Sequence, residues 1–127
     1  MAKIVVIGAS TGGLPAAFEL KAALGPDHEI TVISNTEIFH FIPSNPWVAV
    51  GWRTRADISF PLAPTLEKKG IRFISEPASS IDPVKKEIST RSGALISYDY
   101  LVIATGPGLA FDDVSGLGPE AALTGGS

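Results

Sequence analysis

The chain has 127 residues, the size of one domain, and can bury a core because 45% of its residues are hydrophobic and only 18% are charged. This composition excludes a disordered chain, and a net charge of −3 without a basic cluster excludes a nucleic-acid-binding surface. The absence of cysteine excludes disulfides, thiolate metal sites and thiol nucleophiles within these residues, and neither histidine has a second ligand at metal spacing.

The first strand is predicted at residues 4–7, where four β-branched residues are typical of a strand buried on both faces of a parallel sheet. The apolar run ends at Gly8, far short of the roughly 18 apolar residues needed to span a bilayer. It also lacks the layout of a signal peptide. We therefore expect a soluble, cytoplasmic chain.

A helix is predicted from Leu14, where apolar residues begin to recur at helical spacing. Pro15 is tolerated in the first turn of a helix, and Gly25 and Pro26 end the segment. A second β-branched strand at residues 29–33 completes a βαβ unit, and the crossover of such a unit is almost always right-handed. The sheet is therefore predicted to be parallel.

Residues 35–64 are rich in proline and aromatic side chains. They indicate an ordered excursion, because linkers rarely carry so much large apolar surface. A short helix is predicted over residues 62–69, closed by Gly70, and it leads into a strand at residues 71–74.

Partial alternation of apolar and polar residues over 79–97 favours an antiparallel hairpin or meander. Residues 101–104 form another fully apolar strand, and residues 109–127 lack periodicity. These elements predict a doubly wound α/β domain with a Rossmann-like start, a parallel sheet and a small antiparallel insertion before the last strand.

The segment GASTGG at residues 8–13 follows the first strand and opens the helix, where a dinucleotide-binding fingerprint stands. Gly8 permits the tight turn, Gly13 lets the helix pack close to the strand, and the helix N-terminus can bind a pyrophosphate. Ser10 replaces the middle glycine of the fingerprint. Its side chain could obstruct the phosphate or donate a hydrogen bond to it, and we favour the hydrogen bond. The alternative is a glycine-rich turn that binds nothing.

Ser34 and Asn35 stand at the end of the second strand, where most fingerprints have an acidic residue that binds the ribose hydroxyls. Both side chains can still hydrogen-bond a ribose diol, although without charge. The pair does not distinguish NAD from FAD. The alternative for Ser34 and Asn35 is an ordinary turn pair.

The segment YDYLVIATG at residues 98–106, together with the fingerprint, resembles the FAD domain of flavoproteins with two dinucleotide domains, the pyridine nucleotide-disulfide oxidoreductase superfamily. Within it, residues 39–74 closely resemble sulfide:quinone oxidoreductases, and more distantly type II NADH dehydrogenases and flavocytochrome c sulfide dehydrogenases. The resemblance runs from Met1 to about Gly118. It implies that residues 1–127 are the N-terminal part of a Rossmann-like FAD/NAD(P)-binding domain, truncated, without the second nucleotide domain and the C-terminal region.

The resemblance implies an FAD site assembled from the glycine-rich turn, the end of the second strand and three later segments. Its residues are Gly8, Ser10, Thr11, Gly12 and Gly13 at the pyrophosphate, Ser34 and Asn35 at the ribose, Pro43 and Ser44 near the flavin, Ala78 near the adenine, and Ala104, Thr105 and Gly106 over the cofactor. Ser10 departs from the glycine that is usual in the family.

In this family, cysteine thiols take up sulfide and pass electrons to the flavin, and a later segment forms the quinone pocket and the membrane contact. The chain has no cysteine and ends about where the first of those cysteines is expected. We therefore expect an FAD-binding part without catalytic residues or metal. Quinone and sulfide would be partners of the intact enzyme only. The intact enzyme would be peripheral on the cytoplasmic membrane.

Two alternatives remain. In the FAD part of a type II NADH dehydrogenase, NADH delivers hydride and no cysteine is needed, but residues 43–52 argue against this assignment. A non-enzymatic nucleotide-binding module or inert truncated product is the other alternative, and its unfilled sheet edges and uncovered apolar surface would favour self-association.

Two histidines and two tryptophans are further candidates for site residues. His28 is expected to be structural, in a turn. His40 lies in the region expected to face the flavin, but a packed or capping role is favoured because aromatic residues flank it. Trp47 and Trp52 could cover the flavin ring or anchor the packing of the proline-rich segment, and the sequence leaves both roles open.

Overall fold

The computed structural model describes residues 1–118. Residues 119–127, which belong to the segment predicted to lack periodicity, lie outside the described residues.

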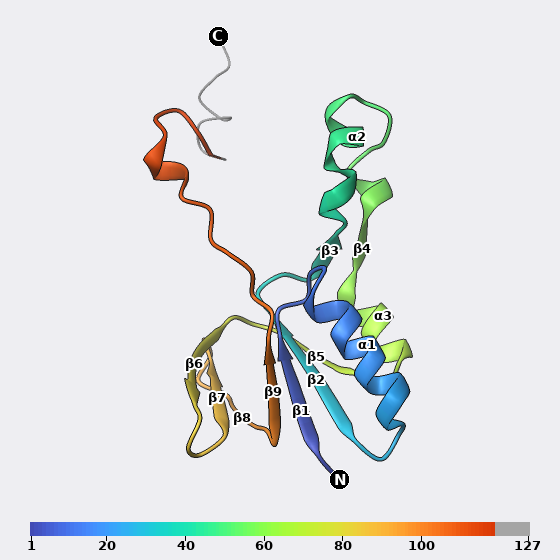
Figure 1. The fold of residues 1–127 in the computed structure, drawn as a ribbon, viewed down its shortest axis with the longest axis vertical. Coiled ribbons are helices and arrows are strands. Elements are labelled where there is room, and N and C mark those ends of the chain that lie inside the picture. The colour runs from blue at the N-terminus through green and yellow to red at the C-terminus, as the bar shows by residue number, and fades with distance from the viewer. Residues whose placement is uncertain (119–127) are drawn as a thin grey trace.

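A parallel sheet of four strands forms the centre of the fold, in the order β5-β2-β1-β9 (Figure 1). The strands are β1 (Lys3–Ile7), β2 (Glu29–Ser34), β5 (Arg72–Ser75) and β9 (Tyr100–Ile103). In the central strand, Ile4 pairs with Ile30 on one side and with Tyr100 on the other, both in parallel register. The predicted parallel sheet is confirmed, and each strand begins and ends within one residue of its prediction.

Helices α1 (Gly13–Leu24) and α3 (Leu62–Lys68) cover one face of this sheet (Figure 1). Between them and the strands lies an apolar core made of Ile4, Val6, Ala9, Leu14, Ala17, Ile30, Val32, Phe39, Leu62, Leu66 and Ile71. Helix α1 ends as predicted at Gly25, whose φ of 71° places it in the region that favours glycine. Its N–H donates to the Lys21 carbonyl and satisfies the last turn.

A three-stranded antiparallel sheet, in the order β6-β7-β8, covers the opposite face. It consists of β6 (Ala78–Asp82), β7 (Glu87–Thr90) and β8 (Leu95–Ser97), which confirms the predicted meander. Its core joins Val5, Ile7 and Ile33 of the parallel sheet to Ile88, Ile96 and Tyr98. A doubly wound domain would carry helices on both faces, so that expectation is corrected: the alternation over 79–97 forms strands, and their apolar side takes the place of a helix.

Ile88 belongs to this second core, and it is fully buried. Replacing it with valine removes one methylene group and leaves a small void. We expect the free energy of unfolding to fall by about 0.5–1.5 kcal/mol. Urea denaturation followed by circular dichroism measures this. An unchanged midpoint would mean that the meander does not pack on the parallel sheet.

Residues 35–61 form an arm that extends beyond the carboxyl edge of the parallel sheet (Figure 1). Strands β3 (Ile38–His40) and β4 (Ser59–Pro61) pair in antiparallel fashion at its base, and α2 (Asn45–Ala49) lies near its tip. Phe39 and Phe60 stack there with ring centroids 4.8 Å apart and join the arm to the core. The segment is therefore ordered, as predicted. Single 3-10 turns occupy Ile42–Ser44, Ala56–Ile58 and Phe111–Asp113.

The helices of residues 1–118 are all too short or too polar to cross a membrane.

Candidate functional site

The glycine-rich turn between β1 and α1 depends on two close backbone approaches. Gly8 has a φ of 102°, and a β-carbon there would collide with the Ala104 carbonyl group. A β-carbon on Gly13 would collide with the carbonyl oxygen of Gly8. Gly12 differs, because its nearest neighbour would be the Ala104 β-carbon at 3.8 Å, an ordinary contact. The fold therefore requires glycine at positions 8 and 13. At position 12 a β-carbon would meet no close neighbour.

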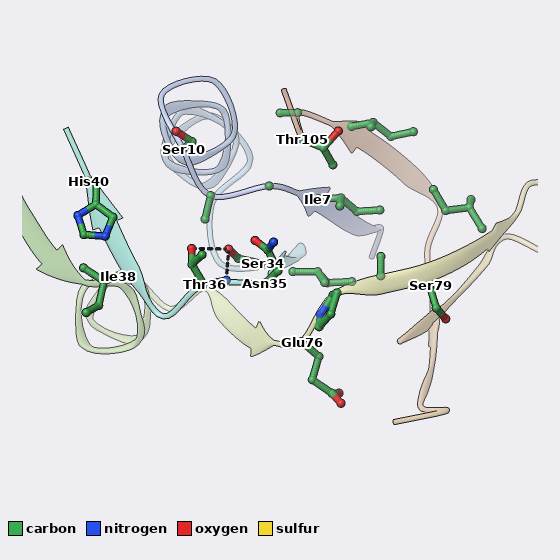
Figure 2. A pocket seen from close by; sticks show the side chains of 18 of the residues that line it. Ile7, Ser10, Ser34, Asn35, Thr36, Ile38, His40, Glu76, Ser79 and Thr105 are labelled. Carbon is green, nitrogen blue, oxygen red and sulfur yellow. Dashed lines mark hydrogen bonds between the residues drawn. The ribbon is translucent and has the colours of Figure 1, made fainter. Parts of the chain in front are cut away.

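A cavity of about 680 Å³ opens at the carboxyl edge of the parallel sheet (Figure 2). The ends of β1, β2 and β9, the start of β6 and strand β3 of the arm all contribute to its wall. In open α/β sheets, ligands bind outside the carboxyl ends of the strands, and this volume falls within the range of small-molecule pockets. Both its place and its size suit an extended ligand.

The structure brings part of the predicted site together around this cavity. The predicted residues that line it are Gly8, Ser10, Ser34, Asn35, Ala78, Ala104 and Thr105. The remaining ones are outside its wall: Thr11 and Gly12 are exposed in the turn, Gly13 is buried in the first turn of α1, Pro43 and Gly106 are exposed, and Ser44 is buried in the arm.

Ser34 and Asn35 have different positions at the end of β2. The Ser34 side chain is buried, and its Oγ accepts a hydrogen bond from the Thr36 N–H at 3.2 Å. This bond holds the turn that leaves Asn35 exposed on the cavity wall. The Ser34 side chain thus stabilises the turn. Asn35 is the side chain of the pair that is exposed at the cavity.

Sequence reasoning missed Glu76, Ser79 and Ser80, which also line the cavity. They follow the carboxyl end of β5, directly beside the end of β2. Parallel strands end at the same edge of a sheet. The predicted strand at residues 71–74 therefore indicates that the residues after it lie at the same edge as Ser34 and Asn35.

The Glu76 carboxyl group extends away from the other labelled side chains in Figure 2. The hydroxyl of Ser92 holds its pKa below the ordinary value of 4.5, against a smaller opposing effect of desolvation, and Thr90 lowers it further. Because the folded-state pKa is depressed, the stabilisation from these contacts is present at neutral pH. It is lost as the pH falls through the folded-state pKa, below 4.5.

We expect the substitution Ser92→Ala to raise the pKa of Glu76 towards its ordinary value, because the carboxylate loses its main hydrogen-bond donor. A titration of the Glu76 side-chain carbon by NMR measures this directly. The matched change Ser97→Ala, in β8 and hydrogen-bonded to Lys3 rather than to Glu76, should leave that pKa unchanged. An equal shift in both variants would contradict the assignment.

The other candidate histidines and tryptophans lie away from the cavity, with one exception. His28 is structural as expected, since its Nδ1 accepts a hydrogen bond from the Ala2 N–H at 3.1 Å. Trp47 and Trp52 lie with ring centroids 5.2 Å apart in the arm, and the Arg53 guanidinium lies 4.7 Å from the Trp47 ring. Neither Trp lines the cavity, and both side chains are exposed. The exception is His40.

Within residues 1–118, no group of three or more histidine or carboxylate side chains is placed to hold a metal ion.

Comparisons with known proteins agree with this geometry. A sulfide-quinone reductase of Aquifex aeolicus is 53% identical over 112 residues, 87% of this chain and 26% of that protein. A type II NADH:quinone oxidoreductase of Staphylococcus aureus is 29% identical over 108 residues, 82% of this chain and 26% of that protein. The X-ray structure of the sulfide:quinone oxidoreductase of Aquifex aeolicus superposes with a TM-score of 0.83 at 51% identity, covering 87% of this chain and 26% of that one.

The chain spans about a quarter of the length of these relatives. The similarity confirms the predicted resemblance to sulfide:quinone oxidoreductases and the Rossmann-like fold. Residues 2–124 match the family described as pyridine nucleotide-disulphide oxidoreductase. With its parallel sheet, its glycine-rich turn and a match over nearly its whole length, the chain belongs to the pyridine nucleotide-disulphide oxidoreductase family.

Proposed function

We propose that this chain is the FAD-binding part of a flavin-dependent sulfide:quinone oxidoreductase. The observation that carries the proposal is its 53% identity, over 87% of its length, to the Aquifex aeolicus sulfide-quinone reductase. The 29% identity to the Staphylococcus aureus type II NADH:quinone oxidoreductase makes the NADH-dependent alternative the weaker one.

The glycine-rich turn fits the pyrophosphate of FAD. The backbone N–H groups of Thr11 and Gly12 have no acceptor among the described residues, and both residues are exposed. They stand at the N-terminus of α1, where the helix dipole favours a negative charge. The Ser10 hydroxyl, exposed on the cavity wall, would donate a further hydrogen bond to a phosphate oxygen.

The rest of the cavity fits the nucleoside end of the cofactor. Asn35 would hydrogen-bond the ribose hydroxyls, and Ala78 on β6 would lie beside the adenine, opposite the apolar end of β1. Thr105, at the end of β9, would close over the pyrophosphate from the other side of the turn. Pro43, Ser44 and Gly106 would act farther along the cofactor, beyond the cavity wall.

FAD, when bound, would supply the two-electron chemistry that links sulfide to quinone. The residues of this chain bind and orient it. With no cysteine among the 127 residues, uptake of sulfide would fall to thiols outside them. The proposal places the whole enzyme peripherally on the cytoplasmic membrane, where a quinone is dissolved.

The test is an absorption spectrum of the purified chain after mixing with FAD and desalting, followed by denaturation to identify the released nucleotide. Retained FAD is the expected result. A chain that is folded by circular dichroism and retains no flavin would contradict FAD binding.

A second experiment tests the redox reaction. In the protein as the cell makes it, sulfide should bleach the flavin band and a quinone should restore it. Bleaching by NADH instead of sulfide would favour the type II NADH dehydrogenase.

A further inference from the structure

His40 has one ring nitrogen fixed by a chain of two hydrogen bonds. Its Nδ1 lies 2.7 Å from the Ser59 Oγ, across the β3-β4 pair. The Ser59 hydroxyl in turn donates to the Arg55 carbonyl oxygen at 2.7 Å. A hydroxyl has a single hydrogen, which the carbonyl oxygen takes, so Ser59 can only accept from the ring. His40 Nδ1 therefore carries a hydrogen, and in the neutral ring Nε2 has the free lone pair.

The second nitrogen of this ring, Nε2, belongs to a side chain that lines the cavity. His40, Ile38 and Ile42 line the cavity wall from the arm. Nε2 has no hydrogen-bond partner within residues 1–118, and no buried side-chain nitrogen or oxygen there lacks one. Nε2 is therefore reached by solvent, and it is an acceptor that the protein leaves unused.

The position of His40 relates it to one part of the proposed ligand. In Figure 2, His40 and Ser79 lie at opposite ends of the cavity, with Ser10, Ser34 and Asn35 between them. With adenine beside Ala78 and the pyrophosphate at the turn, the group that follows along FAD is the ribityl chain, a polyol. A neutral imidazole nitrogen accepts hydrogen bonds from hydroxyl groups, whereas a phosphate has no hydrogen to donate at neutral pH.

We infer that His40 is a cofactor-binding residue: its Nε2 accepts a hydrogen bond from a hydroxyl of the polyol between pyrophosphate and flavin, and Ser59 is a positioning residue that fixes the tautomer and orientation of the ring. The inference rests on the proposed FAD binding and adds to it a residue that recognises the flavin half of the cofactor. His40 thereby distinguishes FAD from nucleotides that end at the diphosphate.

Dissociation constants of FAD and of ADP, which has the same adenosine and diphosphate but no polyol, test the inference. We expect His40→Phe to weaken FAD about three- to tenfold, the effect of one lost hydrogen bond, and to leave ADP unchanged. Ser59→Ala should show part of this loss for FAD. It should have no further effect in the His40→Phe background, because Ser59 acts through His40.

The control is His28→Phe, the same chemical change at the far end of the sheet, where the ring contacts Ala2. It should leave both constants unchanged. Equal affinities of the wild-type chain and the His40→Phe variant for FAD would overturn the inference and leave FAD binding intact. Equal losses for FAD and ADP would assign His40 to the diphosphate and overturn it as well. A folded wild-type chain that binds no FAD would overturn the proposed function and the inference together.

Discussion

Replacing Gly13 with alanine is expected to lower the free energy of unfolding by about 3 kcal/mol or more, at the upper end of the cost of overpacking. The added β-carbon would meet the carbonyl oxygen of Gly8, a backbone atom that cannot move without disturbing the turn. Gly8 is itself held in place by its N–H, which donates to the Ile33 carbonyl oxygen at 2.8 Å. The collision would therefore spread from α1 to the β1-β2 pair. Thermal and urea unfolding, followed by circular dichroism, measure the loss.

Gly12→Ala is the matched control for this experiment. The two glycines are adjacent, but a β-carbon on Gly12 has 3.8 Å to its nearest neighbour, and its φ of −93° suits any residue. The stability of this variant should remain close to that of the wild type. Equal destabilisation by both substitutions would show that close packing of α1 on β1 is not the reason for the glycine at position 13.

Replacing Ser10 with aspartate is expected to weaken FAD binding roughly 10- to 100-fold, because a carboxylate would face the negatively charged pyrophosphate across the turn. The fold should tolerate the change. Ser10 is exposed, and a negative charge near the N-terminus of α1 interacts favourably with the helix dipole. Fluorescence titration with FAD at low and high salt gives the affinity, and salt should reduce the difference between variant and wild type.

The control for net charge is Val84→Asp, at a side chain that is 90% exposed in the β6-β7 turn and outside the cavity wall. It adds the same charge without approaching the ligand, so FAD affinity should not change. An unaltered affinity of the Ser10→Asp variant would place the pyrophosphate away from the glycine-rich turn.

The sequence was most informative where local patterns decide the structure. Four short runs rich in β-branched or apolar residues predicted the four strands of the parallel sheet, and Gly25 marked the end of α1, because strand residues and a left-handed helix end leave clear residue patterns. The pairing of Ile38–His40 with Ser59–Pro61 could not be predicted, because two three-residue strands carry too little alternation to fix a register.

The candidate site was predictable where it follows the strand ends. The dinucleotide-binding fingerprint predicted Gly8 and Ser34, and the resemblance to flavoproteins implied Thr105; all three line the cavity. The arm was harder, because its side-chain directions depend on tertiary contacts. Ser44 faces Arg53 within the arm, with Arg53 Nη1 donating to its Oγ at 3.0 Å, and His40 reaches the cavity.

The central strand of the sheet has neighbours from very different parts of the chain. On one side β1 pairs with β2, to which α1 connects it. On the other side it pairs with β9, where Ile4 lies opposite Tyr100. The Lys3 N–H also donates to Asp99 Oδ2 at 2.7 Å, just before β9. During synthesis, one edge of β1 therefore stays open until the ribosome has released Ile103. Because contacts between such distant residues slow folding, we expect the βαβ unit to form before β9 pairs with β1.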